Sequence, residues 1–276
     1  MKKPVVLQFG LGAWGSKHAA ILGLMDRVSY VGVDIDRGSY FPEVIRSVNP
    51  NMVVITTNSV NHFPIALHCL SSSIPVFVEK PIALTSGQVF ALKTASENNN
   101  TPLIAGYQLV FAPELYHLRH SAAAMVSIRS GAIPRDEGAI LSLATHDLAL
   151  AFWSLSRPVR SFKVEGSRHD ALVELYYSDS PGKEFAASIH VKSISQAKTR
   201  HTIFCLDNGH TVSFTPDNWS RVDLLLAELT AFVNQILDPC DEYVRFYGSL
   251  PFTVADAACR IDAALRSNES RCGTFF

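Results

Sequence analysis

The sequence predicts an α/β domain built on a parallel sheet with helices on both faces, followed by an α+β domain whose sheet is mostly antiparallel. Up to Gly106, short apolar runs rich in β-branched residues alternate with segments of helical periodicity. Strands that alternate with helices form parallel sheets with right-handed crossovers. After Gly106, short runs of alternating polarity are separated by turn-forming clusters, which is typical of antiparallel strands. We therefore expect a first domain over residues 1–106 and a second over residues 107–276.

The elements of the first domain follow from these patterns in order. Buried strands are expected at residues 4–9, 29–33, 52–55, 76–78 and 103–105. Helices are expected after Gly15, where Ile21, Leu24 and Val28 recur at helical spacing, and at residues 64–70 and 86–97. The triplet of asparagines at 98–100 ends the last of these helices.

The second domain becomes rich in strands after residue 160. Strands are expected at residues 162–165, 172–177, 185–191, 203–206 and 212–214. Two amphipathic helices follow, one marked by Leu225, Leu229, Phe232 and Ile236, the other by Val254, Ala258, Ile261 and Leu265.

Composition restricts the class of function. The formal net charge is −1 and the basic residues are scattered, so we expect a small-molecule substrate rather than nucleic acid. The five cysteines form no Cys-x-x-Cys pair and the histidines show no ligand spacing, which argues against a metal site and a disulfide framework. No apolar run has the ~18 residues of a membrane helix. A cytoplasmic protein that binds no membrane is expected.

The segment Gly10-Leu-Gly-Ala-Trp-Gly15 matches G-x-G-x-x-G. In a nucleotide-binding loop the first glycine allows the tight turn, the second lets the backbone approach a pyrophosphate, and the third permits close packing of helix and strand. Glycines also end many ordinary βα turns. Here, however, the motif follows a strand, opens a helix and precedes Asp34 at the end of the next strand, which is the context of a Rossmann dinucleotide site.

The choice of dinucleotide depends on the residues after the second strand. Asp34 is placed to accept hydrogen bonds from the ribose hydroxyls of NAD and to repel a 2′-phosphate. Arg37 lies close enough in sequence to pair with that phosphate, so NADP stays possible. The sequence therefore favours NAD.

These residues resemble the Gfo/Idh/MocA oxidoreductases, which are relatives of glucose–fructose oxidoreductase and inositol dehydrogenase. The resemblance rests on the glycine motif with Trp14 and His18, on Thr56-Thr57 with His62, and above all on Glu79-Lys80-Pro81. It continues over residues 106–111 with Pro113, and over residues 138–153, which are centred on His146 and look like the family's substrate-domain helix. The resemblance implies hydride transfer between a nicotinamide and a hydroxyl or ketone of a sugar, an inositol or a sugar derivative. The cofactor-binding residues that motif and resemblance imply are Gly10, Gly12, Ala13, Trp14, Gly15, Asp34, Arg37, Thr56, Thr57, Asn58, His62, Glu79 and Lys80.

Hydride transfer at a carbon that bears a hydroxyl needs a group that takes or gives the hydroxyl proton. The resemblance gives this role to Lys80, at the carboxyl edge of the sheet, and to His146, whose ring titrates near neutrality. Without the resemblance, Lys80 could equally be a surface lysine and His146 a structural histidine. The substrate-binding residues implied are Tyr107, Gln108, Ser142, His146 and Asp147, although packing alone also accounts for a tyrosine at 107.

Two positions and one stretch of the chain depart from the family pattern. Ser142 stands where the family usually has an aspartate, Asn58 replaces a common proline, and the short stretch between residues 36 and 52 indicates that a helix–strand pair is trimmed. Because a serine cannot carry a carboxylate charge, a nucleotide-binding protein with lost or altered catalysis is one alternative, and a reductase of imines or amino sugars is another. An exposed sheet face in the second domain would suit a homo-oligomer.

Overall fold

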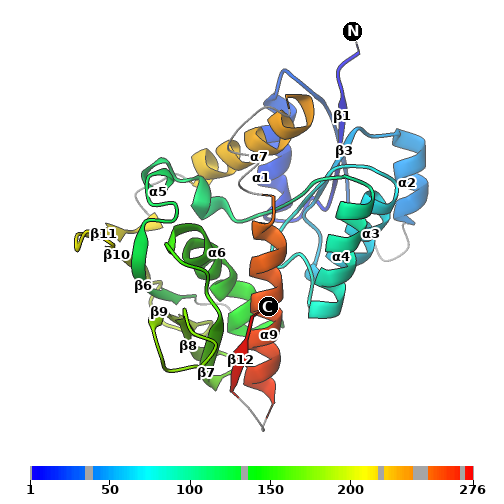
Figure 1. The fold of residues 1–276 in the computed structure, drawn as a ribbon. Helices are drawn as coiled ribbons and strands as arrows, with labels where there is room; N and C mark the ends of the chain where they lie inside the picture. The colour runs from blue at the N-terminus through cyan, green and yellow to red at the C-terminus, as the bar shows by residue number, and fades with distance from the viewer. Residues whose placement is uncertain are drawn as a thin grey trace. The chain divides into compact units, whose positions relative to one another are not determined.

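The computed structural model describes residues 2–34, 40–131, 136–216, 221–238, 248–267 and 271–275. The chain divides into two compact units (Figure 1). The first unit comprises Met1–Gly106 and Arg221–Phe252, and the second comprises Tyr107–Ser220 and Thr253–Phe276. The chain leaves the first unit after Gly106, where the sequence placed the domain boundary. It returns at helix α7, a segment that the sequence analysis assigned to the second domain.

The return of α7 (Arg221–Leu237) to the first unit has a packing explanation. The Phe232 ring is fully buried, with its centroid 5.8 Å from that of Phe77 in the sheet of the first unit. Arg27, which precedes β2, donates hydrogen bonds to two residues at the end of α7, to Asn234 at 2.6 Å and to Asp238 at 2.8 Å. An amphipathic pattern shows that a helix has a buried face, but it does not show which unit covers that face.

The first unit is a five-stranded parallel sheet in the order β2-β1-β3-β4-β5. Its strands are β1 (Val5–Phe9), β2 (Ser29–Val33), β3 (Met52–Ile55), β4 (Val76–Val78) and β5 (Leu103–Ala105). Its helices are α1 (Gly15–Leu24), α2 (Phe41–Val48), α3 (His62–Ser71), α4 (Ser86–Asn98) and α7, with a 3₁₀ turn at Ser59–Asn61. Figure 1 shows α1 and α7 on one face of the sheet and α3 and α4 on the other.

The strand order places a topological switch point between β1 and β3, because the chain leaves β1 toward one edge of the sheet and β3 toward the other. Ligands of open parallel sheets bind at the carboxyl ends of the strands beside this point. Helix α2, which the sequence analysis did not predict, occupies the short stretch before β3. It starts with a proline in its first turn and buries Pro42 and Ile45.

The second unit contains a seven-stranded sheet in the order β11-β10-β6-β9-β8-β7-β12. Its strands are β6 (Ala122–Ser130), β7 (Ser161–Ser167), β8 (Asp170–Tyr176), β9 (Phe185–Lys192), β10 (Arg200–Leu206), β11 (Thr211–Phe214) and β12 (Cys272–Thr274). The sheet is mostly antiparallel, as predicted, with one parallel pair between β6 and β9. Strand β6, which lies inside the sheet between β9 and β10, was not predicted.

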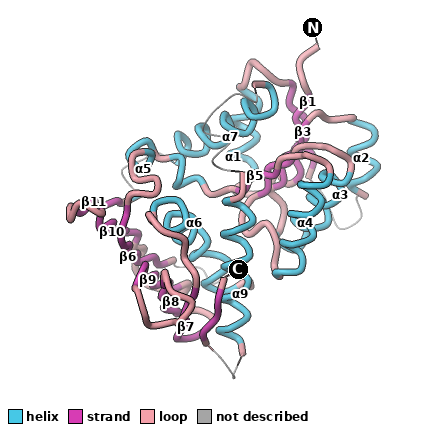
Figure 2. The backbone as a smooth tube through the Cα atoms, in the orientation of Figure 1, coloured by secondary structure: helices cyan, strands magenta, loops and turns pink. Residues whose placement is uncertain are grey.

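Helices cover one face of this sheet. They are the 3₁₀ helix Gln108–Phe111, α5 (Pro113–Tyr116), the π-helical segment Ile140–Ala144, α6 (Thr145–Ser154) and α9 (Leu250–Arg266), which begins at the end of the first unit. Figure 2 distinguishes these helices from the strands by colour. On the other face, Val126 and Ile128 of β6 are exposed to 41 % and 46 %. Among the described helices, none has the length and apolarity needed to span a bilayer.

Candidate functional site

The three glycines of the loop after β1 have different surroundings. Gly10 has φ +93°, and a Cβ atom there would lie 2.7 Å from the backbone of Thr56. A Cβ atom on Gly15 would overlap the carbonyl oxygen of Gly10 and lie 2.7 Å from the Thr56 hydroxyl. On Gly12, by contrast, it would meet no atom of the described residues within 4 Å. The first and third glycines are therefore required by packing, whereas the second leaves an exposed backbone surface open, as a pyrophosphate requires.

The loop is held from below by Gln8, a polar side chain that is fully buried in β1. Its amide nitrogen donates to the carbonyl oxygens of Gly10 at 2.9 Å and Gly15 at 2.8 Å. Thr56, which follows β3, donates a hydrogen bond from its hydroxyl to the Gly10 carbonyl oxygen at 2.7 Å. These bonds fix the loop before any ligand binds. Gln8 was not predicted as a site residue, although a glutamine in an otherwise apolar strand can indicate one.

Asp34 lies at the end of β2 and is exposed. One of its carboxylate oxygens accepts a hydrogen bond from the backbone N–H of Leu11 at 3.1 Å, so the carboxylate lies beside the glycine loop. Ala13 is also exposed in this loop. Arg37 lies outside the described residues. The Asp34 position fits the role predicted for it, since a carboxylate at this edge can accept hydrogen bonds from ribose hydroxyls.

Glu79, at the end of β4, is a buried carboxylate with several donors. Its Oε1 accepts a hydrogen bond from the Trp14 indole at 2.6 Å and lies 3.1 Å from His18 Nε2. Its Oε2 accepts one from the backbone N–H of Lys80 at 3.1 Å. Burial raises the pKa of Glu79, but the hydrogen bond and charge of His18 and the Trp14 hydrogen bond outweigh burial and hold this pKa below its ordinary value.

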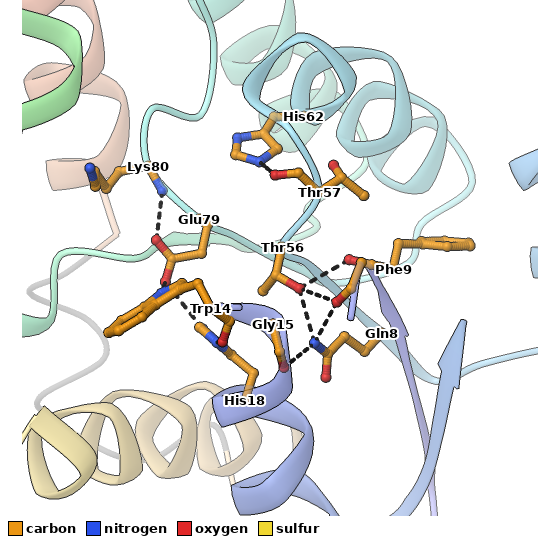
Figure 3. A network of polar contacts seen from close by, with 11 residues as sticks. Gln8, Phe9, Trp14, Gly15, His18, Thr56, Thr57, His62, Glu79 and Lys80 are labelled. Atoms are coloured by element: carbon orange, nitrogen blue, oxygen red, sulfur yellow. Dashed lines mark hydrogen bonds and ion pairs between the residues drawn. The ribbon is translucent and has the colours of Figure 1, made fainter. Parts of the chain in front are cut away.

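Glu79 therefore remains ionised at neutral pH and joins the glycine loop to the end of β4 (Figure 3). Gly106 completes this arrangement, because a Cβ atom there would lie 2.8 Å from the Glu79 carboxyl group. His18 is fully buried and contacts the carboxylate directly. It was not among the predicted site residues, although it lies one helical turn after Trp14.

Lys80 follows Glu79 and is partly buried, and its bond to Pro81 is cis. His62, at the start of α3, is 2 % exposed. One ring nitrogen, Nδ1, lies 2.7 Å from the Pro81 carbonyl oxygen, and Nε2 lies 2.9 Å from that of Thr57. Burial lowers the pKa of His62, while the two carbonyl groups act in the opposite direction.

The structure thus brings the predicted cofactor residues of the described part of the chain to one edge of the first unit. They follow β1, β2, β3 and β4, and they range from buried to exposed. The exposed members are Gly12, Ala13, Asp34 and Asn58. Thr56 and Thr57 are half-buried, and the Thr56 side chain supports the glycine loop.

The predicted substrate residues belong to the second unit. His146 lies in the first turn of α6 and is half-buried. Ser142 lies in the preceding π-helical segment, where its buried hydroxyl donates to the Gly138 carbonyl. Tyr107 is fully buried, whereas Gln108 is half-buried.

Asp147 has a structural environment that the sequence analysis did not anticipate. It is fully buried, and its carboxylate accepts hydrogen bonds from Arg129 Nε at 2.6 Å and Nη2 at 2.9 Å. Ser127 adds a third at 2.7 Å. Both donors belong to β6, so Asp147 anchors α6 on the sheet instead of offering its carboxylate to solvent. Among the described residues, no cluster of three or more histidines, cysteines and acidic residues could hold a metal ion.

Comparison with known proteins identifies the type of domain. Residues 28–107 match the model of the Gfo/Idh/MocA family, described as an oxidoreductase family with an NAD-binding Rossmann fold. No curated protein matches the chain.

Solved structures share the fold over nearly the whole chain. GenD2 from gentamicin A biosynthesis, solved in complex with NAD, is 16 % identical with a TM-score of 0.79, over 100 % of this chain and 97 % of its own. The scyllo-inositol dehydrogenase from Lactobacillus casei is 15 % identical with a TM-score of 0.80, over 99 % and 98 %. UDP-N-acetylglucosamine 3-dehydrogenase GnnA from Acidithiobacillus ferrooxidans is 18 % identical with a TM-score of 0.74, over 96 % and 98 %.

These findings confirm the predicted fold class and the predicted resemblance to Gfo/Idh/MocA oxidoreductases. The family model that matches residues 28–107 describes an oxidoreductase family with an NAD-binding Rossmann fold, and the predicted oxidoreductase activity and the predicted cofactor NAD agree with that description. At these identities the solved structures establish the fold.

Proposed function

We propose that this chain is an NAD-dependent dehydrogenase or reductase that acts on a hydroxyl or ketone group of a sugar, an inositol or a sugar derivative. The observation that carries the proposal is the open backbone at Gly12, beside the Asp34 carboxylate at the carboxyl edge of a parallel sheet. The substrates named for the structural relatives, an inositol and a nucleotide sugar, support the substrate class.

In this proposal the glycine loop and Asp34 hold the dinucleotide, with Thr57, Asn58 and His62 near it. Bound NAD would accept a hydride, and NADH would donate one. Asp34 favours NAD, and NADPH is the alternative if Arg37 reads the 2′-phosphate. The residues Trp14 and Glu79 keep the loop in place through their mutual hydrogen bond.

Lys80 and His146 are the proposed proton-transfer residues. Lys80 can donate a proton to the substrate oxygen, or take it, from the end of β4. The imidazole of His146 can do the same near neutral pH. Ser142 cannot replace the carboxylate of the family pattern, because its hydroxyl has no ionised form at neutral pH and donates to Gly138.

That property of Ser142 also favours a second candidate, a nucleotide-binding protein of the same fold with lost or altered catalysis. A reductase of imines or amino sugars is a third, because the same hydride donor and proton donors suit a C=N bond. We further propose a cytoplasmic protein that forms homo-oligomers through the exposed sheet face around Val126 and Ile128.

The test starts with calorimetric titration of NADH and NADPH, followed by a turnover screen of inositols, sugars, nucleotide sugars and the corresponding imines. Lys80→Ala and His146→Ala should each lower kcat by about 10²–10⁴ while the Kd for NADH stays within a few-fold. The matched controls are Lys93→Ala in α4 and His117→Ala in the second unit, which should leave kcat unchanged. NADH binding without turnover of any substrate would favour the second candidate, and absence of dinucleotide binding would refute the proposal.

A further inference from the structure

The His62 imidazole connects two segments that leave neighbouring strands. Thr57 belongs to the segment after β3, and Pro81 belongs to the segment after β4. Each offers a backbone carbonyl oxygen to one nitrogen of the ring, at 2.9 Å and 2.7 Å. The ring is almost fully buried, so water does not compete for these contacts. Figure 3 shows the ring beside Thr57.

The Lys80 backbone is consequently held on both sides. Its own N–H donates to Glu79, and the carbonyl group of the next residue, Pro81, faces His62. A lysine side chain is a flexible four-carbon stem, and it can present its amine at a defined place only if its backbone is fixed. The two contacts supply this fixation on either side of Lys80.

We propose that His62 is a positioning residue for Lys80, acting through the Pro81 carbonyl group, which it ties to the segment that contains Thr57. The inference rests on the proposed function, and it takes Lys80 to be a cofactor-binding residue as well as a proton-transfer residue, so that bound dinucleotide covers its amine. It gives His62 a role in the placement of the lysine, in addition to its predicted place near the cofactor.

The ring chemistry sharpens the inference. A carbonyl oxygen only accepts hydrogen bonds, and a neutral imidazole carries a single N–H. A neutral ring can therefore donate to Pro81 or to Thr57, whereas an imidazolium can donate to both. The charged groups that face the ring are Glu79 and Lys80. If His62 acts through Pro81, the donor that matters is at Nδ1.

Two substitutions with amide side chains test the contacts of His62 with Pro81 and with Thr57 one at a time. In His62→Asn the amide nitrogen takes the place of Nδ1 and can still donate to Pro81. In His62→Gln it takes the place of Nε2 and can donate only to Thr57. His62→Phe keeps a ring and removes both donors. The control is His68→Asn, on the same helix with its ring against Phe41.

The readout is the reactivity of the Lys80 amine, which needs no turnover. Each variant is treated with acetic anhydride in the presence and absence of NADH, and acetylation of Lys80 is followed by peptide mass spectrometry. The Kd for NADH is measured in parallel by calorimetry. At NADH concentrations about ten times the Kd, a lysine that the dinucleotide covers should be protected about tenfold.

We expect this protection in the wild type, His68→Asn and His62→Asn, and its loss in His62→Gln and His62→Phe although NADH still binds. Equal protection in His62→Gln and the wild type would overturn the inference, and so would equal loss in His62→Asn and His62→Gln. If His62→Phe does not fold, the comparison of the two amides still decides. If the wild type binds NADH but Lys80 is not protected, the inference fails while dinucleotide binding stands. If the wild type binds no dinucleotide, the proposed function fails, and the inference with it, before any variant is compared.

Discussion

Substitution of two glycines in the same loop should separate ligand binding from folding. A side chain on Gly12 would meet no described atom within 4 Å, so Gly12→Val should change the free energy of unfolding by less than about 1 kcal/mol. It would nevertheless occupy the surface that a pyrophosphate must approach, and we expect NADH binding to be lost. Gly15→Ala should act differently, because its Cβ atom would overlap the Gly10 carbonyl oxygen, which is backbone and is held by Gln8 and Thr56.

Forcing an atom into a packed site costs about 1–3 kcal/mol. For a unit of this size, Gly15→Ala should then lower Tm by roughly 2–12 °C, since 1 kcal/mol corresponds to about 2–4 °C. Scanning calorimetry gives the Tm, and titration with NADH gives the affinity of each folded variant. The reasoning is refuted if folded Gly12→Val binds NADH as tightly as the wild type does, or if Gly15→Ala is as stable as Gly12→Val.

Three further predictions concern carboxylates. Asp34→Ala should lower the ratio of the NADPH dissociation constant to the NADH dissociation constant, as measured by calorimetry. A wild type that already binds NADPH more tightly would contradict the assignment of Asp34 as the residue that selects NAD. Because the folded state holds the pKa of Glu79 below its ordinary value, Glu79 adds stability above the unfolded pKa of about 4.3, and this stability is lost as the pH falls through the folded pKa. Urea unfolding between pH 3 and 7 should therefore show a smaller pH dependence in Glu79→Gln, and an unchanged one would exclude this contribution. Arg129→Met and Asp147→Leu should each cost about 3–5 kcal/mol, and the double variant much less than their sum, whereas additive values in urea unfolding would show that the pair is not coupled.

The sequence predicted the elements whose residues follow simple physical rules. The strands of the first sheet are short apolar runs, and the glycine loop was found because its turn and its close packing exclude side chains. The contact partners of Gln8 and His18 could not be predicted from the pattern, because these side chains join residues that only the folded chain brings together.

Strand β6 was missed for a specific reason. Its inward positions carry Ser127 and Arg129, whereas Val126 and Ile128 are exposed on its outer face. This alternation is the reverse of the usual one, since the buried carboxylate of Asp147 requires polar donors inside. Asp147, next to His146, was predicted to bind substrate, but the same ion pair holds its carboxylate in the interior of the second unit. The residue type alone does not distinguish an aspartate that binds a ligand from one that pairs with a buried arginine.

Each of the two proposed proton-transfer residues is next to a carboxylate in the sequence. Neither carboxylate is placed to act as an acid or a base on the substrate. Glu79, beside Lys80, is engaged by Trp14 and His18, and Asp147, beside His146, is engaged by Arg129. An acid or base in catalysis must reach the substrate and exchange protons near the working pH. Both carboxylates are buried and held by several donors, so neither can reach a substrate. In the proposed reaction, proton transfer therefore depends on the amine of Lys80 and the imidazole of His146. The two carboxylates hold the backbone next to these two residues in place.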